Sequence, residues 1–154
     1  MPKPPAHHLR RRPPFFHPVP LRARSDGWTE ARQCAFLAQL YVTGSVSAAA
    51  RSVGMTRMSA YRLRARAGAE SFAHAWDRVL TPPGSGKCAA LRPDWRKVTT
   101  QSLLQRQEAG LLQPVVYRGQ VVGIRRKADN SALLRLLRRS EARCAGDAPE
   151  GSEW

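Results

Sequence analysis

The chain has 154 residues, the size of one domain or of a small domain with tails. It carries 26 Lys and Arg against 11 Asp and Glu, a formal net charge of +15; only four of the 26 are lysines, and a surplus of arginine is typical of proteins that bind polyanions. The composition excludes a membrane span, which needs roughly 18 apolar residues in a row, and a disulfide framework, because the three cysteines are odd in number and scattered.

Residues 1–26 are expected to form a flexible, basic arm. Seven of them are prolines, and Arg10, Arg11 and Arg12 form a continuous basic run. Such a segment buries too little apolar surface to offset the entropy of ordering. The three arginines are candidates for contacts with phosphates, and a solvated tail without function is the equally weighted alternative. Because prolines and histidines also interrupt any apolar signal segment here, we expect a cytoplasmic protein.

Helical periodicity dominates residues 27–80, where we expect a helix-turn-helix domain of three or four helices. Capping residues and glycines divide this part into helices over residues 29–42, from Ser45 or Ser47 to Gly54, over residues 57–66 and over residues 70–80. Residues 82–86, with two prolines and two glycines, then indicate a linker over residues 81–97.

Residues 98–140 are expected to form a small α+β unit. A helix from Thr99 or Thr100 to Gly110 precedes a β-hairpin with glycine in its turn, and Asp129 caps a final helix. The leucines of this final helix are expected to face a partner surface, with its arginines outside. Residues 141–154 are expected to be a disordered tail. The predicted fold class is therefore mainly α, with a helix-turn-helix domain, a small helix–hairpin–helix unit and disordered tails.

The most informative stretch is residues 47–66, which fits two helices joined by a tight turn. Ala50 supplies a small face where the helices cross, and Gly54, four residues later, tolerates a positive φ. The opposite face of the second helix is rich in arginine and has no acidic residue, as a recognition helix in the DNA major groove requires. We predict base-edge contacts from Arg57, Met58, Tyr61 and Arg62, and contacts with the DNA backbone from Arg51, Arg64 and Arg66.

These residues resemble the helix-turn-helix unit of phage terminase small subunits and of related homeodomain-like proteins of phages and bacteria. The resemblance covers about residues 27–80 and rests on residues 44–50, 54–56, 60–64 and 72–77. It implies a DNA-binding domain joined to a segment for oligomerisation or for a partner such as the packaging motor. The C-terminal half departs from this family because it is short and contains a hairpin, and the Pro- and Arg-rich arm precedes the DNA module.

Enzyme chemistry finds little support in the sequence. The acidic residues between the tails have no spacing that gathers two or three of them around a metal ion. The segment Gly84–Lys87 lacks the first glycine of a phosphate-binding loop and is followed by Cys88 instead of Ser or Thr. We expect no enzyme activity, no cofactor and no metal site.

The sequence therefore predicts a protein that binds double-stranded DNA, as a transcriptional regulator or a phage-derived DNA-recognition factor, in the cytoplasm or on the nucleoid. The alternative is an assembly or adaptor protein, like a terminase small subunit, that recognises DNA and recruits a protein partner or a second copy through residues 98–140. A general coat on RNA or DNA is a third hypothesis, which the charge allows. For the hairpin, a small core or a self-association surface is favoured over a basic ribbon lying on DNA.

Overall fold

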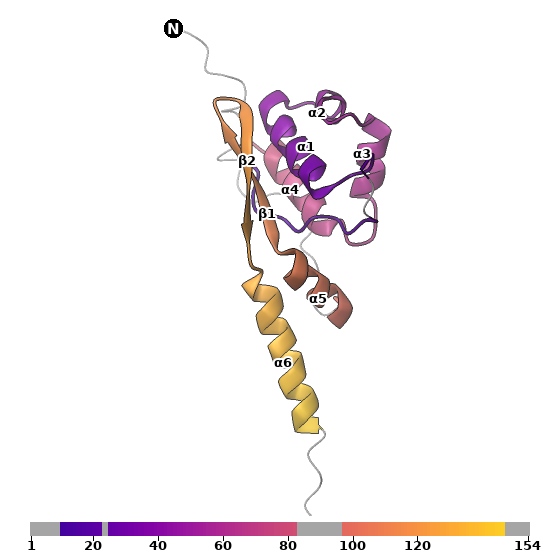
Figure 1. The fold of residues 1–154 in the computed structure, drawn as a ribbon, viewed down its shortest axis with the longest axis vertical. Helices are drawn as coiled ribbons and strands as arrows, with labels where there is room; N and C mark the ends of the chain where they lie inside the picture. The colour runs from indigo at the N-terminus through magenta and orange to yellow at the C-terminus, as the bar shows by residue number, and fades with distance from the viewer. Residues whose placement is uncertain (1–9, 23–24, 83–96, 147–154) are drawn as a thin grey trace, which may run out of the picture.

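The computed structural model describes residues 10–22, 25–82 and 97–146. Within these residues the chain is mainly helical, with six helices and one two-stranded antiparallel hairpin, which confirms this part of the predicted fold class. Most of the predicted linker, and the outer part of both predicted tails, lie outside the described residues. The elements in chain order are α1 (Glu30–Thr43), α2 (Val46–Ser52), α3 (Arg57–Arg64), α4 (Glu70–Leu80), α5 (Thr100–Ala109), β1 (Leu111–Tyr117), β2 (Gln120–Lys127) and α6 (Asn130–Gly146) (Figure 1).

The helix boundaries follow the capping residues of the sequence. Thr29, Ser45, Thr56 and Thr99 each precede a helix, and each side-chain oxygen accepts a hydrogen bond of 3.1–3.3 Å from a backbone N–H of the first turn. Gly44 ends α1 in the left-handed conformation, with φ at 68°, and donates its N–H to the Leu40 carbonyl. Local chemistry therefore sets where these helices begin, and a glycine sets where α1 ends.

Aromatic rings form the centre of the unit made by α1–α4. The centroid of the Phe36 ring in α1 lies 5.0 Å from that of Trp76 and 5.9 Å from that of Phe72, both in α4. Trp28 packs edge-on against Phe36 at 5.5 Å, and all four side chains are buried. Large rings in contact contribute most of the apolar burial of a small core, so this cluster fixes α4 across α1.

Residues 10–22 lie against the core, which corrects the expectation of a flexible arm for this part of residues 1–26. Phe16 is fully buried, and its backbone N–H and C=O each pair with Leu112 of β1 at 2.9 Å. Arg10 donates to the carbonyls of Tyr41 and Val42 at 2.7 and 2.9 Å, where α1 ends. Burial of the phenylalanine offsets the cost of ordering, and the prolines reduce that cost because they restrict the unfolded chain.

Gln33 of α1 holds this segment in place. Its side chain is 1% exposed and makes three hydrogen bonds to backbone groups. Oε1 accepts from the Val19 N–H at 2.7 Å, and Nε2 donates to the carbonyls of Val19 and Trp28 at 3.2 and 3.1 Å. A buried amide that satisfies three backbone groups fixes the register of the segment on α1.

The C-terminal half forms a layer on α1 and an extension beyond it. The hairpin packs on α1, while α5 and α6 pack on each other and α6 projects away from the helical unit (Figure 1). The strands pair from Leu111 with Lys127 to Tyr117 with Gln120. Helix α6 continues to Gly146, which corrects the expectation of disorder for residues 141–146.

The face that α6 turns inward differs from the predicted one. Its least exposed residues follow one another at helical spacing: Ala132, Arg135, Leu136 and Arg139. Arg139 donates to the Val98 carbonyl at 2.6 Å and to the Thr100 hydroxyl at 3.2 Å, at the start of α5. An arginine that was expected outside therefore joins the two helices, because its guanidinium reaches two acceptors at the start of α5.

Asp129 connects α6 to residues 10–22. Its Oδ1 accepts from the Ala132 N–H at 3.1 Å and so caps α6, as the sequence predicts, while its Oδ2 lies 2.7 Å from Nε2 of His17. Burial lowers the pKa of His17, and the Arg106 guanidinium acts in the same direction, against the opposing Asp129 carboxylate. His17 is therefore neutral at pH 7, with its Nε2 lying against the Asp129 carboxylate.

Candidate nucleic-acid interface

Helices α2 and α3 are joined by residues 53–56. Gly54 adopts a φ of 75°, and the N–H groups of Val53 and Met55 both bond to the Ala50 carbonyl, at 3.2 and 2.9 Å. Ala50 is fully buried, so the small residue stands where the sequence requires close packing. A positive φ is open to glycine at little cost, which is why the chain turns at this residue.

One side of α3 is anchored in the core. Ala60 and Leu63 are buried, with Leu63 only 2% exposed. On the same helix, the Ser59 hydroxyl accepts a hydrogen bond of 2.8 Å from Nε1 of Trp28. These contacts fix the rotation of α3 about its axis and so determine which residues point outward.

The outward side of α3 carries the four residues predicted to contact base edges. Arg57, Met58, Tyr61 and Arg62 are all exposed, Met58 by 63% and Tyr61 by 42%. The Arg57 guanidinium lies 5.6 Å from the centroid of the Tyr61 ring, whose other neighbour is Trp76 at 5.2 Å. Tyr61 is thus held against the core while part of it faces outward.

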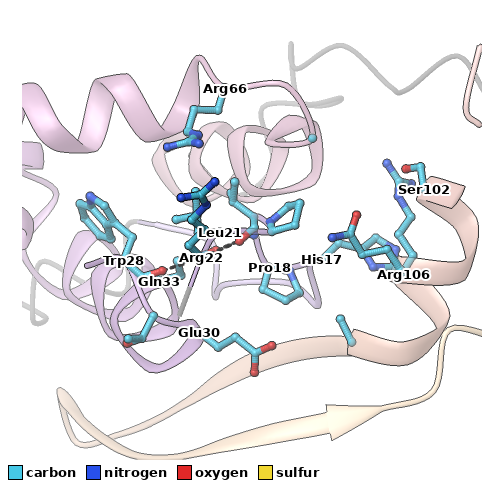
Figure 2. A pocket seen from close by; sticks show the side chains of 16 residues that line it. His17, Pro18, Leu21, Arg22, Trp28, Glu30, Gln33, Arg66, Ser102 and Arg106 are labelled. Carbon is cyan, nitrogen blue, oxygen red and sulfur yellow. Dashed lines mark hydrogen bonds between the residues drawn. The ribbon is translucent and has the colours of Figure 1, made fainter. Parts of the chain in front are cut away.

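The arginines predicted to contact the DNA backbone are placed differently from one another. Arg51 is exposed in the last turn of α2. Arg64 makes two hydrogen bonds with the Asp77 carboxylate, at 2.7 and 2.8 Å, and lies 5.1 Å from the Trp76 ring centroid, so it joins α3 to α4. Arg66 follows α3 and faces a cavity (Figure 2). The outward face of α3 therefore keeps Arg57 and Arg62 as its basic residues.

The three arginines predicted to contact phosphates from the N-terminal arm also differ in their exposure and contacts. Arg10 bonds to carbonyls at the end of α1, as described above, and Arg11 is half-buried. Arg12 is exposed. The guanidinium of Arg10 already donates to backbone carbonyls. Of the three arginines, Arg12 therefore has the exposure that a contact with a phosphate requires.

The basic residues of the hairpin lie away from α3. In Figure 1 the hairpin covers the side of α1 opposite α3. Arg126 pairs with Glu30 at 2.8 Å, and the Lys127 ammonium lies 4.3 Å from the Phe15 ring centroid. Tyr117 and Val122, at the end of the hairpin, are 61% and 59% exposed. The hairpin thus presents a mixed apolar and basic surface separate from the α3 face.

Within residues 10–22, 25–82 and 97–146, no three His, Cys, Asp or Glu side chains come close enough together to hold a metal ion. No helix in the described part of the chain is long and apolar enough to cross a membrane. Comparisons with protein families, with curated proteins and with solved structures found no significant match for this chain.

Proposed function

We propose that this chain binds double-stranded DNA, with α2 and α3 acting as a helix-turn-helix and α3 lying in the major groove. The observation that carries the proposal is the outward face of α3, where two arginines, a methionine and a tyrosine are exposed opposite the buried Ala60 and Leu63. The major groove, about 12 Å wide, admits an α-helix, and arginine donates two hydrogen bonds to the edge of guanine. Arg57 and Arg62 are the residues proposed for this role.

Backbone contacts would position the helix in the groove. Arg51 on α2 and Arg12 in the N-terminal segment are exposed and basic, and phosphate contacts of this kind set orientation without reading sequence. The net charge of +15 supports the sequence-independent part of the affinity. Double-stranded RNA is the weaker candidate, because its deep, narrow major groove does not admit a helix.

The test is the affinity of Arg62→Ala for a DNA fragment selected from genomic DNA by the wild-type protein. Loss of one base contact lowers the affinity by about 1–3 kcal/mol and relaxes sequence preference at one position. Arg78→Ala is the matched control, because Arg78 is exposed at the end of α4 and carries the same charge. If both variants lose the same affinity, Arg62 contributes only charge and the assignment of α3 as the recognition helix fails.

A second candidate function, assembly through the C-terminal unit, rests on exposed leucines of α5 and α6. Leu104, Leu134 and Leu137 are 48%, 55% and 51% exposed. Ala132 is the buried residue of the 17-residue α6, and a helix with so little packing gains little stability from its own chain. We propose a second copy as the partner, because α6 projects away from the helical unit (Figure 1) and its exposed leucines can pack against the same leucines of a second copy.

Light scattering and sedimentation test the assembly. The wild-type protein should be a dimer or a larger ring, and Leu134→Gln with Leu137→Gln should yield monomers, whereas Leu80→Gln, at a 37% exposed leucine of α4, should not. Added salt should strengthen the assembly, because it screens the repulsion between the arginines of the paired helices. A ring of many copies would favour a packaging role, and a dimer a regulatory one. A wild-type monomer at the highest soluble concentration would overturn this candidate.

A further inference from the structure

A cavity of about 740 Å³ lies between residues 17–22, the start of α1, the turn after α3 and the helix α5 (Figure 2). Its size is within the range of sites for small molecules, about 300–1,000 Å³. Apolar side chains, among them Leu21 and Trp28, form part of its wall. Three arginines from separate segments of the chain also line it: Arg22, Arg66 and Arg106.

The charge of the cavity favours an anion. In Figure 2, Arg22 and Arg66 point toward one another across the space. Two guanidinium groups that point toward one another repel each other, and an anion between them replaces repulsion by charge-assisted hydrogen bonds. Glu30 is the single carboxylate among the described residues of the lining, and it already pairs with Arg126 at 2.8 Å.

The apolar wall is built before any ligand arrives. Trp28 is 8% exposed and its indole N–H bonds to Ser59, while its carbonyl accepts from Gln33. Gln33 also fixes Val19, which lines the cavity. A wall held by buried hydrogen bonds lowers the cost of ordering on binding. Such a wall suits a flat ring, which buries apolar area without many rotatable bonds.

We propose that this cavity binds a planar organic anion, with its ring on the apolar wall and its charged group between Arg22 and Arg66. The cavity is linked to α3 at two points. Trp28 bonds to Ser59 within α3, and Arg66 lies two residues after the last residue of that helix. The bound anion thereby changes the affinity of α3 for DNA; this coupling rests on the proposed function, whereas binding of the anion does not.

Calorimetry on the full chain tests the binding with two pairs of probes. Salicylate is compared with salicylamide and adenosine monophosphate with adenosine, so that each pair differs in charge. At least one anion should bind one to one, at least tenfold tighter than its neutral partner. Inorganic phosphate is the third probe, and it should bind at least tenfold more weakly than that anion. Absence of anion binding in both pairs, or phosphate binding as tightly, overturns the proposal.

Two double variants locate the site. Arg22→Gln with Arg66→Gln should weaken binding of the anion at least tenfold. Arg57→Gln with Arg62→Gln removes the same charge from the outward face of α3 and should leave the binding within twofold. Equal weakening by the two variants would show attraction by net charge alone and would overturn the site.

The coupling is measured as the affinity for the selected DNA fragment with and without saturating anion. A change of at least threefold is expected in the wild-type protein and none in the Arg22 and Arg66 double variant. Unchanged DNA affinity in the wild-type protein overturns the coupling and leaves the binding site standing. If the chain binds no DNA at all, the calorimetry still decides whether the anion binds, so the two failures are distinguishable.

Discussion

Replacement of Gln33 by Met tests how strongly residues 10–22 belong to the fold. Methionine keeps the length and approximate volume of the side chain, so the change removes hydrogen bonds without opening a large cavity. It leaves the Val19 N–H and the carbonyls of Val19 and Trp28 without their partner, in an environment where Gln33 itself is 1% exposed. An unsatisfied buried polar group costs about 1–3 kcal/mol, and a carbonyl less than an N–H. The three together predict a loss of about 3–5 kcal/mol in the free energy of unfolding.

The assay is equilibrium denaturation in urea, followed by circular dichroism and by tryptophan fluorescence. A loss of this size is a large part of the 5–15 kcal/mol that stabilises a typical domain. Gln101→Met, at an exposed position of α5, is the matched control and should change stability by less than about 0.5 kcal/mol. A Gln33→Met protein within about 1 kcal/mol of the wild type would refute the reasoning, since the segment would then add little to the core.

Three further predictions concern single side chains. Arg64→Met should lower the free energy of unfolding by up to about 1 kcal/mol, because it breaks a half-exposed ion pair. The Arg64→Met protein should bind DNA more tightly than Arg62→Ala does. If Arg64→Met binds DNA more weakly than Arg62→Ala, Arg64 contacts the DNA. Burial raises the pKa of the Cys34 thiol to about 12. A thiol reagent at pH 8 should therefore modify the exposed Cys144 and spare Cys34 until the protein unfolds. Modification of Cys34 in the folded protein, detected by mass spectrometry of the peptides, would contradict this prediction. Because burial lowers the pKa of His17 from its ordinary 6.5, the unfolded chain takes up that proton first as the pH falls. The free energy of unfolding should therefore keep its full value above pH 6.5 and decline below it. In urea denaturation, His17→Gln should make this decline with pH less steep. An equally steep decline in both proteins would contradict the prediction.

Much of the helical architecture could be predicted because it depends on neighbouring residues. Thr29, Thr56 and Thr99 are capping residues that act on the next turn, and Gly44 and Gly54 are glycines at turns where φ is positive. Interactions of this kind span three or four residues and can therefore be predicted from the sequence. The exposed side of α3 follows from the same periodicity, because it lies opposite the apolar positions.

The contacts of residues 10–22 could not be predicted in this way. Proline and arginine dominate the segment by number, and composition alone therefore indicated disorder. The decisive residues are Phe16, which is buried against Leu112, and His17, which reaches Asp129, both about a hundred residues away in the sequence. Pairing over such a distance depends on the assembled fold.

The partners of several arginines could not be predicted from the sequence either. Arg64 and Arg139 look like solvent-facing residues on helices with several arginines, yet one pairs with Asp77 and the other with the Val98 carbonyl. The cavity between Arg22 and Arg66 arises from the turn after α3 meeting the N-terminal segment. A sequence pattern gives the face of a helix but not the group that faces it from another element.

The most direct test of DNA recognition by α3 is to select fragments of the source genome with purified protein at near-physiological salt and to sequence what is retained. The wild-type protein should enrich a recurring motif, and Arg62→Ala should enrich the same motif with one position relaxed, while Arg78→Ala should leave the motif unchanged. Retention of fragments without any enriched motif would contradict the account, because the charge of +15 would then bind phosphates without reading bases.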